Sequence, residues 1–277
     1  MNIYNDYPLK NITTIGLGGY CKEFICPENV NDLKMIIEHN ALFIGNGSNV
    51  CFLTDYYNNK VISLKKMKKN ISHDEKYISC TSNVSCTKLA RYLFNNRISG
   101  YEFLYGIPGT IGGAIFMNAG AFHQEIMPNV YSIEVLDAQG KIFTLNKEQI
   151  NYTYRSSNID KNLIIISIKL LNKQTNFDPL LLGKLEDRRK ETQPTNLLSC
   201  GCIFKNPHGD YAARLIEDAE LKGFRIGGLY VSQKHSNYFI NDGTGSHQDF
   251  ILLLNTVKDK IFNKYNIELT EEVVLIK

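Results

Sequence analysis

The strongest indication of the architecture is the segment Gly106-Ile107-Pro108-Gly109-Thr110-Ile111-Gly112-Gly113-Ala114. A second glycine cluster, Gly45-Asn46-Gly47-Ser48-Asn49, directly follows the apolar run Ala41-Leu42-Phe43-Ile44, which predicts a buried strand. Glycine lets backbone N–H groups approach an anion closely, so a glycine cluster after a strand predicts a concave surface of donors. Ser48, Asn49 and Thr110 add side-chain donors. Both segments therefore suit the diphosphate of a nucleotide.

Neither glycine segment matches the best-known phosphate-binding motifs. Gly45-x-Gly47 lacks the third glycine of a dinucleotide-binding fingerprint, and neither segment ends in the Gly-Lys-Ser/Thr of a P-loop. Either segment alone is also compatible with a tight turn. Because both occur in one chain, we favour a nucleotide site.

Helical and strand patterns alternate along the chain. Helical spacing predicts helices over residues 30–39, 85–96, 211–219 and 248–265, and a surface helix or linker over 185–192. Apolar or alternating runs predict strands over residues 41–44, 61–64, 77–80, 133–136, 141–145, 162–171, 238–241 and 267–276. Two of these strands flank a turn that contains Gly140, which is typical of an antiparallel hairpin. The sequence predicts a mixed α/β (α+β) protein with a subdomain boundary near residue 175.

Composition and charge exclude several classes of protein. The 277 residues are 43% hydrophobic and carry a formal net charge of only +3, so no dense basic surface for nucleic acid is expected. The apolar run Leu163 to Leu171 is about half the length of a bilayer-spanning helix, so no membrane insertion is expected. The N-terminus lacks the basic start and the long apolar stretch of a secretory signal, which predicts a cytoplasmic protein.

The seven cysteines show no Cys-x-x-Cys pair and no matching histidine spacing. This pattern predicts neither a disulfide framework nor a metal site. In a reducing compartment most of them are expected to be small buried hydrophobic residues. The exception is Cys202, because of the residues around it.

The order of the motifs resembles one enzyme family. The two glycine segments, Gly100 and Glu102 before the second of them, and the later run Met117-Asn118-Ala119-Gly120-Ala121 are similar to the FAD-binding half of UDP-N-acetylenolpyruvoylglucosamine reductases. The resemblance implies the FAD-binding fold shared with vanillyl-alcohol oxidase, in which two α/β subdomains clasp the cofactor and a third domain covers the substrate. It implies FAD-binding subdomains at residues 1–65 and 66–175 and a C-terminal substrate-binding domain at residues 176–277.

The resemblance also implies the ligands. Non-covalent FAD would contact both glycine segments and also Asn118, Ala119 and Gly120. NADPH would be the reductant, and the substrate would be UDP-N-acetylglucosamine enolpyruvate, which is reduced to UDP-N-acetylmuramate for peptidoglycan synthesis. No obligate protein partner is implied. In length the chain is similar to the short form of the family.

Tyr154-Arg155-Ser156-Ser157 lies between two predicted strands and resembles the family's Tyr-Arg-x-Ser motif, whose arginine lies beside the substrate carboxylate. A guanidinium offers a planar pair of donors to a carboxylate and stays charged at every relevant pH. Without the resemblance, an arginine in a surface loop is the simpler interpretation. With it, Arg155 is the expected carboxylate ligand and Tyr154 a substrate contact.

Cys200-Gly201-Cys202-Ile203-Phe204-Lys205-Asn206-Pro207 resembles the family's Ala-Gly-Ser-x-Phe-Lys-Asn-Pro, whose serine donates a proton to the reduced substrate. This chain departs from the pattern, because Cys202 occupies the position of that serine. A thiol with an ordinary pKa of about 8.5 is a much stronger acid than an alcohol, so Cys202 is the expected proton donor. An inert buried cysteine is the alternative.

Glu272, in Leu269-Thr270-Glu271-Glu272-Val273, corresponds to the family's final catalytic glutamate, and the implied role is to stabilise the enol intermediate. Taken alone, this acidic pair is an ordinary solvent-facing feature of a strand start. Lys205, Asn206 and Lys222 are expected at the substrate or the nicotinamide nucleotide, because a diphosphate needs cations and donors.

Two other functions fit parts of the pattern. An oxidase or dehydrogenase of the same fold would keep the glycine segments but not Arg155, Cys202 and Glu272 together. A non-catalytic nucleotide-binding protein would be colourless after purification, and only fold sharing supports it. The joint presence of the three residues favours the reductase.

Overall fold

The computed structural model describes residues 1–37, 41–173 and 176–277. The chain divides into two compact units. Unit 1 contains Met1–Asn5, Glu23–Gly45 and Asn59–Arg188, and unit 2 contains Asp6–Lys22, Asn46–Asn58 and Arg189–Lys277. Both units contain helices and sheets, which confirms a mixed α+β protein. The predicted boundary at residue 175 lies outside the described residues, and the three-part division stays a prediction.

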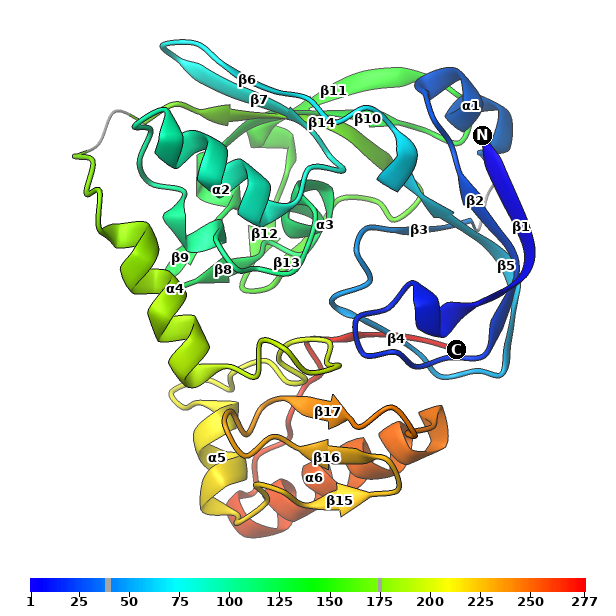
Figure 1. The fold of residues 1–277 in the computed structure, drawn as a ribbon, viewed down its shortest axis with the longest axis vertical. Coiled ribbons are helices and arrows are strands. Elements are labelled where there is room, and N and C mark those ends of the chain that lie inside the picture. Colours follow the sequence, from blue (N-terminus) through cyan, green and yellow to red (C-terminus); the bar gives the residue numbers. More distant parts are fainter. Residues whose placement is uncertain (38–40, 174–175) are drawn as a thin grey trace. The chain divides into compact units, whose positions relative to one another are not determined.

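Unit 1 is built around a five-stranded antiparallel sheet. Figure 1 shows α2 (Cys86–Asn95) and α3 (Ile111–Phe116) on one side of this sheet. Pairing of Leu136 with Ile142 confirms the predicted hairpin. The strand order is β11 (Ile142–Asn146), β10 (Val130–Leu136), β14 (Ile164–Leu171), β7 (Tyr77–Thr81) and β6 (Ile71–His73). Side chains from the sheet and both helices fill one core, among them Ile78, Leu89, Ile115 and Ile168.

Helix α2 illustrates how local chemistry sets the ends of an element. Ser85 caps its N-terminus, where the serine hydroxyl accepts a hydrogen bond from the backbone N–H of Lys88 at 3.2 Å. Leu89 and Leu93 lie four residues apart and are fully buried, so the apolar stripe of the helix faces the core. Arg97 follows the helix with a φ of +58°, the left-handed conformation that commonly ends helices.

A second sheet has the strand order β1 (Asn2–Pro8), β2 (Tyr20–Cys26), β5 (Tyr56–Ser63) and β3 (Leu42–Ile44). The chain passes from one unit to the other within β1, β2 and β5. Strands β3 and β5 are parallel, with Ile44 paired to Ser63. Leu33 of helix α1 (Val30–Ile36) shares a buried cluster with Ile62 of β5. The predicted end of this helix at His39 lies outside the described residues.

Unit 2 contains a three-stranded antiparallel sheet made of β15 (Arg225–Ile226), β16 (Leu229–Val231) and β17 (Phe239–Asn241). Figure 1 shows α5 (Ala212–Asp218) and α6 (His247–Tyr265) beside it. Phe239, Phe250 and Leu253 belong to one buried cluster of the sheet and α6. Unit 2 also holds the parallel pair β4 (Val50–Phe52) and β18 (Val274–Ile276).

The predicted strand over residues 267–276 is wrong over most of its length. Only Val274–Ile276 form a strand, β18, because the residues before it pair with another segment. The backbone N–H groups of Glu272 and Val273 both donate to the Ile203 carbonyl oxygen, at 2.8 and 3.4 Å. Two residues opposite one carbonyl form a β-bulge. Apolar periodicity does not reveal such a change of partner.

Several short elements connect these parts. They are β8 (Gly120–Ala121), β9 (Gln124–Glu125), β12 (Tyr152–Thr153), β13 (Ser156–Ser157), helix α4 (Leu181–Thr192) and the 3-10 turns Leu9–Asn11, Leu64–Lys66, Glu102–Leu104, Met127–Asn129 and Lys147–Gln149. Helix α4 contains the predicted surface segment 185–192. None of the helices in the described part of the chain combines the length and the apolar character that a bilayer span needs.

Candidate active site

The first glycine segment is a loop with unused backbone donors. It follows β3, and Gly47 has a φ of +62°. A Cβ atom at Gly47 would lie 1.9 Å from the Ile12 carbonyl oxygen, so only glycine fits. Among the described residues, no protein acceptor binds the backbone N–H groups of Asn46, Gly47, Ser48 and Asn49. Donors of this kind suit an anionic diphosphate.

Most backbone N–H groups of the second glycine segment already have acceptors within the protein. The Gly112 N–H donates to the Ser82 carbonyl oxygen at 2.8 Å, and the Gly113 N–H donates to Thr110 Oγ1 at 3.3 Å. A Cβ atom at Gly45 would lie 2.6 Å from Thr110 Oγ1, so Gly45 packs against the second segment within unit 1. Five further backbone N–H groups of this segment also bond within the protein, those of Gly106, Ile107, Gly109, Ile111 and Ala114. Most N–H groups of this segment are therefore used within the protein, and its role at the diphosphate stays a prediction.

Arg155 lies in a cluster of polar side chains in unit 1. Its Nη2 donates to the Gly120 carbonyl oxygen at 2.8 Å, and its Nη1 lies 3.5 Å from Glu125 Oε1. The guanidinium carbon is 4.7 Å from the ring centroid of Tyr154. Asn118 is fully buried and donates to Glu125 Oε2 at 2.9 Å. The structure thus brings together four predicted residues, Asn118, Gly120, Tyr154 and Arg155.

Ala119 connects this cluster to the second glycine segment. Its backbone N–H donates to the Ala114 carbonyl oxygen at 2.8 Å, near the end of α3. The predicted cofactor residues of unit 1 are therefore contiguous from Gly45 through α3 to Gly120, whose carbonyl oxygen binds the predicted catalytic residue Arg155.

Cys202 is half-buried and forms an isolated antiparallel pair with Tyr238. Beside this pair, the Ile203 N–H donates to the Asn237 carbonyl oxygen at 2.9 Å. Residues directly opposite in such a pair place their side chains next to each other. Burial raises the pKa of the Tyr238 phenol, and the neighbouring Cys202 and Glu272 act in the same direction. The phenol therefore stays protonated at neutral pH.

Glu272 lies on the other side of the same segment. Its N–H donates to the Ile203 carbonyl oxygen at 2.8 Å, and its own carbonyl oxygen accepts from Asn49 Nδ2 at 3.0 Å. The Val274 N–H donates to the Asn49 carbonyl oxygen at 2.9 Å. Within unit 2 the structure thus brings Cys202 and Glu272 together with the first glycine segment.

The other cysteines match the prediction of inert, buried residues. All seven are free thiols, and Cys202 alone is not fully buried. Burial raises the pKa of Cys21 to about 11 and the pKa of Cys80 and Cys200 to about 12. A thiol with so high a pKa is a poor nucleophile at neutral pH.

Three predicted substrate residues also make structural contacts. Asn206 Oδ1 accepts from the Ala212 N–H at 3.1 Å, at the start of α5. Lys222 Nζ lies 2.5 Å from Glu217 Oε1. The backbone of Lys205 belongs to the bridged segment that carries Cys202. The sequence did not indicate these contacts, and the substrate roles of the three residues stay predictions.

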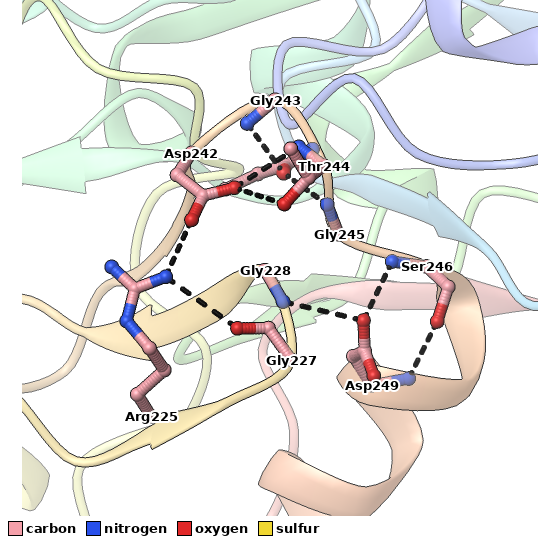
Figure 2. Close-up of polar contacts among 10 residues, drawn as sticks. Arg225, Gly227, Gly228, Asp242, Gly243, Thr244, Gly245, Ser246 and Asp249 are labelled. Atoms are coloured by element: carbon pink, nitrogen blue, oxygen red, sulfur yellow. Dashed lines mark hydrogen bonds and ion pairs between the residues drawn. The ribbon is translucent and has the colours of Figure 1, made fainter.

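The loop before α6 forms a closed network with the β15–β16 turn (Figure 2). Arg225 pairs with Asp242, and the Gly228 N–H donates to Asp249 Oδ2 at 3.4 Å. Hydrogen bonds from Thr244, followed by the contact with Arg225, lower the pKa of Asp242 to about 2. The donors and acceptors of this network bond to one another. The network therefore ties the turn to the helix and is not an anion site.

Sequence reasoning missed Glu125 and Tyr238. Glu125 is far from Arg155 along the chain, and Tyr238 is far from Cys202. Tertiary structure makes both contacts, so neither helical nor strand periodicity signals them.

Two family models match parts of this chain and place it in the FAD-binding class of enzymes. A family model described as "FAD binding domain" matches residues 22–146. A second model, "UDP-N-acetylenolpyruvoylglucosamine reductase, C-terminal domain", matches residues 193–276.

Full-length relatives identify the family. A UDP-N-acetylenolpyruvoylglucosamine reductase of Clostridium novyi is 36% identical over 283 residues, which cover 99% of this chain and 92% of the relative. The reductase of Fusobacterium nucleatum is 33% identical, with 100% of both chains covered. The crystal structure of the Thermus caldophilus reductase matches with a TM-score of 0.83 at 27% identity, covering 100% of this chain and 98% of that one. The chain belongs to the UDP-N-acetylenolpyruvoylglucosamine reductase family, which confirms the resemblance seen in its motifs.

Proposed function

We propose that this chain reduces UDP-N-acetylglucosamine enolpyruvate to UDP-N-acetylmuramate, with FAD as cofactor and NADPH as reductant. The observation that carries the proposal is the full-length similarity to reductases of this name, which includes both the FAD-binding region and the C-terminal domain. The reaction supplies a precursor of peptidoglycan. We place it in the cytoplasm and infer no requirement for a protein partner.

The first glycine segment fits the diphosphate of FAD. The backbone N–H groups of residues 46–49 bind no acceptor among the described residues, and Ser48 adds a hydroxyl group. A Cβ atom at Gly113 would meet only Thr110 Oγ1, at 3.6 Å, which supports close approach of a ligand there. When bound, FAD supplies two-electron chemistry between NADPH and the enolpyruvyl double bond. Residues 106–114 would shape the site by packing, with residues 118–120 at its border.

Arg155 would bind the carboxylate of the enolpyruvyl group. Its side chain is only 16% exposed, and charge-assisted hydrogen bonds are stronger where water is partly excluded. Negative charge grows on the enolpyruvyl group during reduction, and a fixed guanidinium stabilises that charge. Tyr154, whose ring lies against the guanidinium, would contact the same part of the substrate.

Cys202 would supply the proton that completes the reduction. The Sγ–H bond breaks as a C–H bond forms on the substrate, and the thiolate regains a proton from water before the next turnover. Glu272, on the neighbouring strand segment, would accept a hydrogen bond from the enol intermediate. Lys205, Asn206 and Lys222 would bind the diphosphate of the substrate or of NADPH.

An anaerobic titration followed by visible absorbance tests this function. We expect a flavin band that bleaches with NADPH and returns when UDP-N-acetylglucosamine enolpyruvate is added. If the protein stays colourless after reconstitution with FAD, or if this substrate does not reoxidise the reduced flavin, the proposed function is wrong. The glycine segments would then belong to a different nucleotide site.

A further inference from the structure

Glu125 joins the buried Asn118 and the half-buried Arg155 in unit 1 through its two carboxylate oxygens. Oε1 lies 3.5 Å from Arg155 Nη1, and Oε2 accepts from Asn118 Nδ2 at 2.9 Å. The Glu125 side chain is 28% exposed and the Arg155 side chain 16%. Because each oxygen has a different partner, the carboxylate cannot rotate without losing one contact. Its direction toward Arg155 is therefore fixed.

Asn118 is itself fixed on three sides. It is fully buried, and its Nδ2 also donates to the Thr153 carbonyl oxygen at 2.9 Å. Its Oδ1 accepts from the Met127 N–H at 3.3 Å. Thr153 ends β12 just before the Tyr154-Arg155 motif. Asn118 thus holds both the backbone that leads to Arg155 and the carboxylate that faces it.

The backbone of this cluster is unusual. Eight non-glycine residues have a positive φ among the described residues, and four of them belong to the cluster or to the β8–β9 turn that carries Glu125. These four are Asn118 (φ +44°), Phe122 (φ +53°), His123 (φ +62°) and Arg155 (φ +55°). Such conformations persist only where the surroundings hold them, and they concentrate at functional sites. The strain is an independent sign that this part of unit 1 is built to hold one geometry.

We propose that Glu125 is a positioning residue for Arg155. Its carboxylate holds one edge of the guanidinium, while the Gly120 carbonyl oxygen holds Nη2, so that Arg155 meets the substrate carboxylate in one orientation. The inference rests on the proposed function, in which Arg155 binds that carboxylate. Without the Glu125 charge, Arg155 would keep its own charge but lose its fixed direction.

A pair of ligands separates this role from a general structural one. UDP-N-acetylmuramate carries the carboxylate, and UDP-N-acetylglucosamine lacks it. We expect Glu125→Gln to weaken calorimetric binding of UDP-N-acetylmuramate to the oxidised holoenzyme by about tenfold, with binding of UDP-N-acetylglucosamine unchanged. The control is Glu134→Gln, because Glu134 is also half-buried and accepts from Ser167 Oγ at 3.2 Å. This control is expected to change neither affinity.

A double-mutant cycle with Arg155→Lys gives the second readout. If Glu125 acts through Arg155, Glu125→Gln has less than about a twofold effect on UDP-N-acetylmuramate binding in the Arg155→Lys background. Additive effects, or equal weakening of both ligands, would overturn the positioning role. A wild-type protein that binds neither ligand would instead refute the proposed function, and this outcome is seen before any variant is made.

Discussion

Arg155 in unit 1 is held in place by side chains as well as by the Gly120 carbonyl oxygen. Glu125 contacts its guanidinium, Asn118 holds Glu125, and the backbone of Arg155 itself is left-handed. In unit 2, the segment that carries Cys202 is held mostly by main-chain hydrogen bonds, to which the Asn237 side chain adds two at Phe204. Ile203 donates its N–H on one side and accepts through its carbonyl oxygen on the other. Main-chain hydrogen bonds survive most side-chain substitutions. Substitutions near Arg155 should therefore disturb several neighbouring residues, whereas substitutions near Cys202 should disturb only their immediate surroundings.

The largest effect in unit 1 is expected from Arg155→Ala. Loss of the guanidinium should slow reoxidation of reduced flavin by the enolpyruvyl substrate about 10²- to 10³-fold, because the growing negative charge loses its partner. FAD content should stay within about twofold, since Arg155 holds the substrate in this account. Anaerobic stopped-flow absorbance measures the rate, and the flavin-to-protein absorbance ratio measures the content.

Arg97→Ala is the matched control for this substitution. Arg97 is also left-handed and lies in unit 1, but it is exposed at the end of α2. It should change neither quantity. If Arg155→Ala lowers FAD content as much as turnover, Arg155 holds the cofactor and its proposed role is wrong.

Asn118→Ala should have a smaller effect on substrate reduction than Arg155→Ala, but it should also lower the stability of the fold. The change removes two donated hydrogen bonds and leaves the Met127 N–H without its acceptor. Such losses in a buried site cost about 2–3 kcal/mol, which corresponds to a decrease in Tm of about 5–10 °C. Substrate reduction should fall as well, because Glu125 loses its support. Differential scanning calorimetry and the flavin reoxidation rate test the two parts.

Asn266→Ala controls for the cost of placing alanine in a left-handed conformation. Asn266 has a φ of +54° at the exposed C-terminus of α6. If it lowers Tm as much as Asn118→Ala, the buried hydrogen bonds of Asn118 contribute little. The claim that side chains hold Arg155 in place would then be wrong.

The smallest effect is expected from Tyr238→Phe. The change removes only the phenol hydroxyl, and the ring of the residue that pairs with Cys202 remains. Turnover should stay within about twofold of wild type. A tenfold loss would show that the phenol takes part in the reaction, and main-chain positioning would no longer explain how Cys202 is held.

The parts of this structure that the sequence predicts are local. Helix α2 and the β10–β11 hairpin follow from apolar spacing and a glycine turn, which a short stretch of chain contains in full. The role predicted for the segment 106–114 at the diphosphate stays a prediction. The N–H groups of this segment bond to residues such as Ser82, and only the fold brings these acceptors near.

Contacts between distant segments explain what the sequence did not show. Residues 270–273 leave the expected strand because residues 203–205 offer them partners from far along the chain. Glu125 and Tyr238 are common residue types, and neither lies at a position that helical or strand periodicity marks. They acquire a role only when Arg155 and Cys202 lie beside them.

The central claim is that Cys202 donates the proton to the reduced substrate. The most direct test reduces wild type, Cys202→Ser and Cys202→Ala with NADPH and then mixes each with UDP-N-acetylglucosamine enolpyruvate in an anaerobic stopped-flow instrument. NADPH should bleach the flavin band of all three proteins at similar rates. The return of the flavin band should be about 10²- to 10⁴-fold slower in Cys202→Ala, with a partial recovery in Cys202→Ser. If Cys202→Ala returns the flavin band at the wild-type rate, the proton comes from another group and the account is contradicted.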